Sequence, residues 1–115
     1  MQISRAAGNA EAACERVLRS LPLWFGQEQS VLDYVRDTSR LPTLVSTDAG
    51  EINGFVTLVQ HAPQSFEISC LAVSASRRGG GIGRALVQGA CAWVREQGGE
   101  FVQVKTLAAA HPSRA

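Results

Sequence analysis

A short glycine-rich segment between two apolar stretches constrains the fold of this chain more than any other feature. Residues 66–73 read FEISCLAV, and the length and the Ile, Leu and Val content of this run predict a strand. The glycine-rich segment, residues 78–84, reads RGGGIGR. Apolar residues then recur at three- and four-residue steps over residues 82–97, which predicts a helix that ends at Gly98 and Gly99. The sequence therefore predicts a strand, a glycine-rich turn and a helix in succession.

We call residues 78–84 the glycine turn. A turn that leads into a helix leaves several backbone N–H groups unpaired at the positive end of the helix dipole. Glycines let a ligand approach that backbone because no Cβ lies in the way. These properties predict an anion site that suits phosphate groups. The residues predicted to form it are Arg78, Gly79, Gly80, Gly81, Ile82, Gly83 and Arg84.

The residues of this turn exclude two common phosphate-binding motifs. A dinucleotide-binding G-x-G-x-x-G fingerprint needs a third glycine, but Gly83 is followed by Arg84, Ala85 and Leu86. A Walker loop needs Gly-Lys-Ser/Thr, which occurs nowhere in the sequence. The pattern that fits is R-x-x-G-x-G, beginning at Arg78. Together with the strand before it and Gly-Arg-Ala-Leu-Val at its end, this segment resembles the GNAT superfamily of acyl-CoA-dependent N-acetyltransferases.

The resemblance implies a coenzyme site and a reaction. It implies that the glycine turn binds the pyrophosphate of coenzyme A through backbone amides, and that acetyl-CoA is the co-substrate. Backbone groups of Leu71, Ala72 and Val73 are then expected to contact the pantetheine arm and the thioester, which a splay between two parallel strands admits. An amine attacks the thioester directly, so the amine must be neutral and the developing oxyanion needs a hydrogen-bond donor.

Two polar residues of the central strands are candidates for the chemistry. Glu67 lies where several family members keep a glutamate that deprotonates the amine, so the resemblance makes it the candidate catalytic base. The alternative is an edge carboxylate that faces solvent or pairs with a basic neighbour, but charges on otherwise apolar strands are uncommon. His61, near the other end of the same predicted hairpin, is a candidate for binding the acceptor or assisting as a base; the alternative is a surface histidine.

The acceptor pocket is less clearly marked. Trp24 and Phe25 lie in a connector that borders this pocket in the family, so they are candidate substrate-binding residues. Core packing is the alternative for any aromatic side chain in a small domain. No acidic cluster points to a polycationic acceptor, and we expect a small-molecule amine or an exposed amino group.

Composition excludes several kinds of partner. The 115 residues are 45% hydrophobic and 18% charged, which is typical of one globular domain, expected over residues 1–115. A net charge of +1 gives no reason to expect nucleic acid or an anionic membrane, and the apolar runs are too short to span a bilayer. Cys14, Cys70 and Cys91 show no metal-ligand spacing. We therefore expect reduced thiols, no metal and a cytoplasmic protein.

The rest of the chain predicts a mixed α/β (α+β) fold. Strands are expected over residues 2–7, 43–47, 52–61, 66–73 and 101–107. A first helix, capped by Asn9, is expected to end near Leu21. A second helix is expected to carry an apolar face formed by Val31, Tyr34 and Val35. Ser30 and Asp33 could form its capping box. The strands should form an antiparallel meander followed by a parallel strand-helix-strand unit.

This order of elements also resembles the GNAT fold from end to end. Family members usually continue past the last predicted strand with a helix, often carrying a tyrosine, and further strands. The sequence ends soon after residues 101–107, so we expect a domain that is C-terminally incomplete relative to the family and a poor catalyst in this form. The outer edge of that strand would then lack a partner and favour a homodimer.

These observations lead to hypotheses from different classes. The first is an acetyl-CoA-dependent N-acetyltransferase that acts on a primary amine. The second is a non-catalytic module that keeps the coenzyme site and serves as an acyl-CoA sensor or partner subunit. The third is a structural domain whose glycine turn binds any small anion, which predicts no preference for coenzyme A over phosphate.

Overall fold

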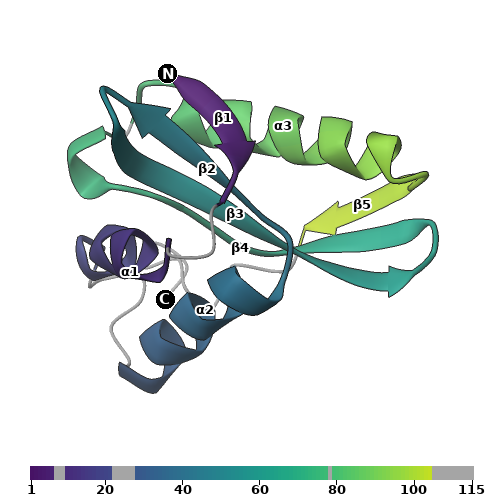
Figure 1. Ribbon diagram of the computed structural model, residues 1–115, viewed down its shortest axis with the longest axis horizontal. Coiled ribbons are helices and arrows are strands. Elements are labelled where there is room, and N and C mark those ends of the chain that lie inside the picture. Colours follow the sequence, from purple (N-terminus) through teal and green to yellow (C-terminus); the bar gives the residue numbers. More distant parts are fainter. Residues whose placement is uncertain (7–9, 22–27, 78, 105–115) are drawn as a thin grey trace.

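The computed structural model describes residues 1–6, 10–21, 28–77 and 79–104. A five-stranded sheet in the order β1-β2-β3-β4-β5 forms its centre. The strands are β1 (Gln2–Arg5), β2 (Thr43–Asp48), β3 (Glu51–Ala62), β4 (Ser65–Val73) and β5 (Phe101–Val104). The helices are α1 (Glu11–Arg19), α2 (Glu28–Arg40), the short 3₁₀ helix η1 (Ala75–Arg77) and α3 (Ile82–Glu96). Figure 1 shows α3 on one face of the sheet and α1 and α2 on the other.

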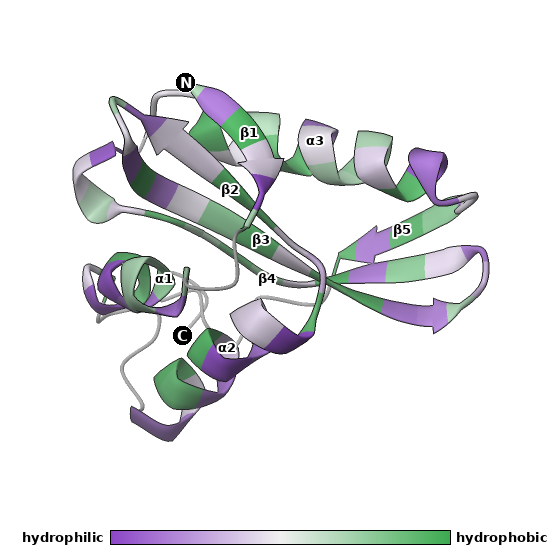
Figure 2. Cartoon of the chain, viewed as in Figure 1, coloured by the Kyte–Doolittle hydropathy of each residue, from purple (hydrophilic) through white to green (hydrophobic). Residues whose placement is uncertain are grey.

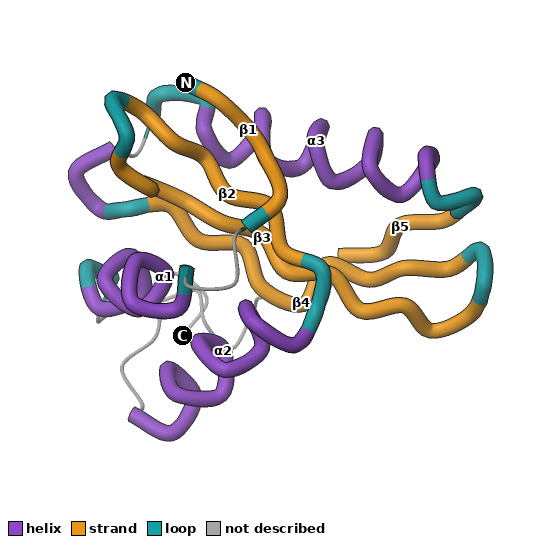
Figure 3. The backbone as a smooth tube through the Cα atoms, in the orientation of Figure 1, coloured by secondary structure: helices purple, strands orange, loops and turns teal. Residues whose placement is uncertain are grey.

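The strand pairing confirms the predicted mixed sheet. β1 to β4 pair antiparallel in sequence order, and β5 joins β4 in parallel after the α3 crossover. The parallel register runs only from Ser65 opposite Phe101 to Ile68 opposite Val104. Figure 3 shows the helices on both sides of the sheet and α3 linking β4 to β5. None of the helices in the described ranges has the length and apolar character that crossing a membrane requires.

Two hydrophobic clusters hold these layers together. Figure 2 shows hydrophobic residues concentrated along the middle strands and α3, with hydrophilic residues on α1 and α2 among apolar ones. The cluster under α1 and α2 includes Cys14, Val17, Leu18, Val31, Val35, Val45, Phe55, Cys70 and Ala72. The cluster under α3 includes Leu44, Val56, Leu58, Phe66, Ile68, Ile82, Leu86, Ala90 and Val94. β4 and α3, the strand and the helix on either side of the glycine turn, are therefore both anchored in the core.

The face of β4 that packs against α3 changes part of the way along the strand. Thr57 pairs with Cys70 while Leu58 pairs with Ile68, which leaves Ser69 as an extra residue in a β-bulge. Ile68 packs in the α3 cluster, whereas Cys70 packs in the cluster under α1 and α2. Glu67, next to Ile68 on the strand, therefore lies on the face opposite α3.

Of the two predicted helix caps, the structure tests only the one in α2. α1 begins after Ala10, which is buried in the core, and no side-chain hydrogen bond from the described residues caps it. Asn9, predicted as the cap, is outside the described residues. Ser30 is not a cap because α2 already begins at Glu28, and Asp33 instead accepts hydrogen bonds from Gln29 and Arg36. Packing of their apolar faces in the core stabilises both helices.

The β5 strand lies at the edge of the described sheet. Phe101 and Val104 are 62% and 59% exposed, while Val102 packs partly against the α3 cluster. Residues 105–107 of the predicted strand lie outside the described residues. The homodimer expected from this edge remains a prediction.

Candidate functional site

The glycine turn follows β4 after Ser74 and η1, and its described residues have the backbone conformation that glycines permit. Gly79 and Gly81 have φ values of 85° and 80°, in the left-handed region that side chains with a Cβ rarely adopt. A Cβ added at either position would meet no atom within 4 Å, so the space above this backbone is open. Gly81 is the N-cap of α3 and supplies no capping side chain, which leaves the first N–H groups of α3 available.

The side chains of the turn divide between the core and solvent. Ile82 is buried in the α3 cluster, so its side chain anchors the helix and only its backbone is available to a ligand. Gly83 is half-buried and faces the side chain of Val73 at the end of β4. Arg84 is exposed and enters no ion pair with the described residues. Arg78 lies outside the described residues.

The residues just before the glycine turn are fixed by contacts with three other elements. Ser74 donates its backbone N–H to the carbonyl of Asn53 at 2.9 Å, and Ala75 donates to the hydroxyl of Ser20 at 3.1 Å. Arg77 forms an ion pair with Asp48 at the end of β2, and this hydrogen bond lowers the pKa of the Asp48 carboxyl. Arg77 is therefore an anchor of this segment, whereas Arg84, within the turn, has no ion pair among the described residues.

The outer edge of β4 beyond Ile68 meets no described residue of β5. Val73 and Gly54 form a non-hydrogen-bonded pair, because the neighbouring Ser74 N–H bonds to the carbonyl of Asn53. From one residue to the next along a strand, the N–H and C=O groups point alternately to its two edges. The N–H and C=O groups of Ala72 therefore face β3, while those of Leu71 and Val73 face the other edge of β4, whose first half pairs with β5. The half-buried side chains of Leu71 and Val73 pack on the α3 cluster, so only their backbone is offered at this edge.

The structure brings the two candidate polar residues of the hairpin together. His61 Nε2 lies 2.7 Å from Glu67 Oε1 in a hydrogen bond. The Glu67 side chain is 27% exposed and that of His61 is 52% exposed. Gln103 of β5 pairs with Glu67 across the parallel register, so it flanks the carboxylate on the same face. Sequence reasoning missed Gln103 because it has no motif, and only the register of the two strands identifies it.

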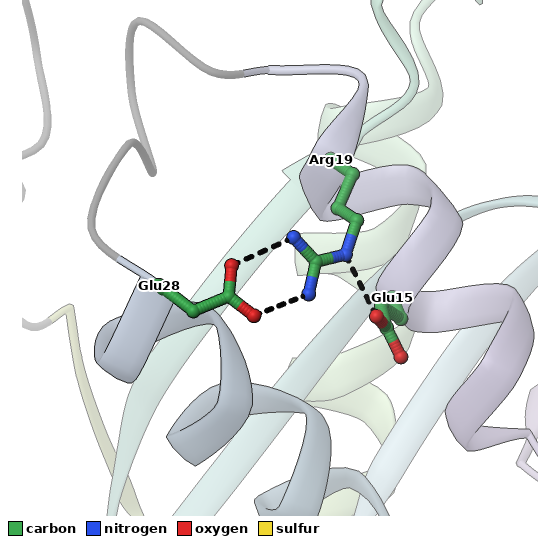
Figure 4. Close-up of polar contacts among 3 residues, drawn as sticks. All are labelled: Glu15, Arg19 and Glu28. Atoms are coloured by element: carbon green, nitrogen blue, oxygen red, sulfur yellow. Dashed lines mark hydrogen bonds and ion pairs between the residues drawn. The ribbon is translucent and has the colours of Figure 1, made fainter.

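The connector with Trp24 and Phe25 lies outside the described residues, but an ion-pair network joins the two helices on either side of it. Arg19 of α1 donates to Glu15 at 2.7 Å and, through both terminal nitrogens, to Glu28 of α2 at 2.9 and 2.8 Å, as Figure 4 shows. These bonds raise the pKa of the Arg19 guanidinium, and the bond from Arg19 lowers the pKa of the Glu28 carboxyl. The network holds the ends of α1 and α2 close together.

Cys14 and Cys70 are buried and Cys91 is half-buried, and none of the three forms a disulfide. Burial raises the pKa of the Cys14 thiol to about 11, which leaves it protonated and unreactive. In the described parts of the chain, no group of three or more His, Cys, Asp or Glu residues is arranged to hold a metal ion.

Comparisons with known proteins agree with this arrangement. The sequence profile of the acetyltransferase (GNAT) family matches residues 11–115. An aminoglycoside 6'-acetyltransferase type Ii has a similar structure, with a TM-score of 0.76 and 24% identity over 90% of this chain and 70% of that chain. An aminoglycoside 6'-N-acetyltransferase complexed with coenzyme A gives a TM-score of 0.77 and 23% identity over 92% of this chain and 62% of that chain.

A third solved structure is slightly closer in sequence. It is an IAA acetyltransferase from Bacillus cereus, with a TM-score of 0.68 and 26% identity over 91% of this chain and 65% of that chain. The chain thus spans between 62% and 70% of the length of these three structures. No curated protein matches the sequence. The mixed sheet with its three main helices is the fold of these neighbours, which confirms the predicted fold class.

Proposed function

The chain belongs to the acetyltransferase (GNAT) family, and from this premise we propose that it transfers the acetyl group of acetyl-CoA to a primary amine. The acceptor is a small-molecule amine or an exposed amino group. Neighbours that are aminoglycoside acetyltransferases, one of them in complex with coenzyme A, support this choice of substrates.

The observation that carries the proposal is the position of the glycine turn directly beyond the open edge of β4. The N–H groups at Gly79 to Gly83 suit a pyrophosphate, because the backbone is unobstructed and lies at the positive end of α3. The outward backbone groups of Leu71 and Val73 suit the amides of a pantetheine arm. A site that bound only a small anion would not require the backbone donors and acceptors of Leu71 and Val73.

The bound co-substrate supplies the thioester carbonyl that the amine attacks. The outward N–H groups of β4 are the donors that this edge offers to an oxyanion, and they are held rigidly because Leu71 and Val73 also pack on the α3 core. A donor that is already oriented stabilises developing charge without reorganising during the reaction.

Glu67 is the residue proposed to prepare the amine. An amine is protonated near neutral pH, so a base must remove a proton before nitrogen can attack. The Glu67 carboxylate is partly shielded, lies on the face away from α3, and is one residue from the point where the described pairing with β5 ends. It can therefore reach a substrate that enters at the open edge while it remains bound to His61.

Free-thiol release from acetyl-CoA, measured with a panel of amines, tests the proposal. The panel contains an aminoglycoside, a polyamine, an arylalkylamine and a peptide with a free N-terminus. Glu67→Gln should lower kcat about a hundredfold with an active amine, while the affinity for coenzyme A stays unchanged. Glu51→Gln, the same change at an exposed carboxylate at the far end of β3, is the matched control and should act like the parent.

Two results would contradict the proposal. Calorimetry that finds no preference for coenzyme A over inorganic phosphate would leave only a general anion site. Coenzyme A binding without transfer to any amine of the panel would favour a sensor or partner module instead.

A further inference from the structure

The contact between His61 and Glu67 links a shielded carboxylate to a group with more access to water. Glu67 Oε1 is 2.7 Å from His61 Nε2, and the histidine side chain is about twice as exposed as the glutamate, at 52% against 27%. Among the described residues, Glu67 forms no other hydrogen bond or ion pair, and His61 Nδ1 forms none at all. The pair therefore has one internal contact and one nitrogen available to solvent.

The hairpin itself produces this contact. Val59 pairs with Glu67 and Gln60 with Phe66, but Ala62 then pairs with Ser65, so His61 is an extra residue in a bulge. His61 follows Val59 by two positions, which brings its side chain to the face that carries Glu67. Figure 1 shows this end of the β3–β4 hairpin extending, with β5 beside it, beyond α1 and α2. Water can therefore reach His61 from the side that no described helix covers.

The proposed reaction requires a path for protons at this place. Each turnover takes one proton from an ammonium group, forms the N–C bond and breaks the C–S bond of the thioester. The net products are an amide, coenzyme A thiol and one proton, so a carboxylate that accepts the ammonium proton must return it to solvent before the next turnover. We propose that His61 carries this proton from Glu67 to solvent, an inference that rests on the proposed function.

The transfer balances within the pair. The O–H bond of the protonated Glu67 carboxyl breaks and the proton bonds to Nε2 of a neutral imidazole, which gives an imidazolium. The imidazolium then loses its Nδ1 proton to water, and the ring returns to its first tautomer by exchange with solvent. Imidazole is suited to this role because it gains and loses a proton near neutral pH.

The other charged side chains described at this end of the sheet form no ion pair with the two residues. The residues opposite Glu67, Val59 on β3 and Gln103 on β5, carry no charge. Glu100 stands before β5, where its backbone N–H bonds to Gln64, and Arg95 and Glu96 end α3 on the other face. None of these three forms an ion pair with His61 or Glu67. His61 is thus the titratable side chain in contact with Glu67 in the described structure.

Chemical rescue tests the inference with the full chain, acetyl-CoA and the best amine of the panel. We expect His61→Ala to lower kcat about tenfold or more in dilute buffer and to leave KM for acetyl-CoA unchanged. Added imidazole should restore the kcat of His61→Ala in a concentration-dependent way and should not affect the parent. His61→Gln keeps a hydrogen-bond donor but cannot relay a proton, so it should remain slow.

Gln60→Ala is the matched control, since Gln60 is exposed in the same turn and bonds only weakly, at 3.4 Å, to the carbonyl of Pro63. It should retain the parent kcat. A parent that acetylates no amine overturns the proposed function and this inference with it. If the parent is active, two results overturn the proton relay alone. One is a His61→Ala variant that keeps the parent kcat. The other is a His61→Gln variant with the parent kcat together with a His61→Ala variant that added imidazole does not restore.

Discussion

Replacement of Gly81 by alanine separates the role of the glycine turn in binding from its role in folding. Gly81 has a φ of 80° and no atom within 4 Å of an added Cβ, so the variant meets backbone strain and no clash. Left-handed backbone costs a residue with a Cβ about 1–2 kcal/mol, which should appear as the same loss in the free energy of unfolding. Gly50 has a φ of 82° and equally empty surroundings but lies in the β2–β3 turn. Gly50→Ala is therefore a matched control for the strain.

Coenzyme A affinity should distinguish the two variants. A backbone hydrogen bond to a charged phosphate contributes about 1.5–3 kcal/mol, so losing one raises Kd by about 10- to 150-fold. We expect this loss in Gly81→Ala and an unchanged Kd in Gly50→Ala, measured by calorimetry on the folded proteins, with urea unfolding for stability. Gly81→Asn tolerates the left-handed backbone better, so it should recover stability without recovering affinity. Equal affinities in Gly81→Ala and Gly50→Ala would refute the assignment of the turn as the pyrophosphate site.

Two further predictions concern the supports of the site. Gly99→Ala would put a Cβ 2.4 Å from Val94 Cγ1 and 3.0 Å from the Val94 carbonyl, so urea unfolding should show a loss of about 1–3 kcal/mol. The pKa of Asp48 is lower in the folded protein than in the unfolded chain because Arg77 bonds to the carboxylate. The ion pair therefore stabilises the fold at pH values above the unfolded pKa. This stabilisation disappears as the pH falls through the folded pKa. The difference in urea midpoint between the parent and Asp48→Asn should accordingly shrink between about pH 6 and about pH 3; a difference that is constant with pH would show that the pair does not couple to folding.

The sequence predicts the elements of this fold well because their patterns are local. The Asp48 to Glu51 turn, for example, appears where expected, with Ala49 and Gly50 both at positive φ. The stop at Gly98 is also confirmed, since its φ is 85° where α3 ends. Turn residues and helix stops depend on the conformational range of single residues, and that information is present in the sequence itself.

The bulges are what the sequence does not reveal. Buried and half-buried residues alternate without interruption along β4, yet the side chains before and after Ser69 point to opposite cores. A regular strand with the same alternation would keep all its buried residues on one face. The second bulge, at His61, decides the distance to Glu67, and it too depends on pairing with residues elsewhere in the chain. The sequence therefore suggests His61 and Glu67 as candidates, but it does not predict that their side chains meet.

Core packing and the candidate site are built from the same residues of β4 and α3. Leu71 and Val73 bury part of their side chains under α3 and direct their backbone groups outward, so one residue serves both purposes. Gly54 makes the junction possible, since a Cβ there would lie 3.2 Å from the side chains of both Ile82 and Leu86. Because Gly54 has no Cβ, the first turn of α3 lies directly on β3, and this contact fixes the positive end of the helix beside the end of β4. Because packing sets that position, a change in this part of the core would alter coenzyme binding even where no ligand contact is lost.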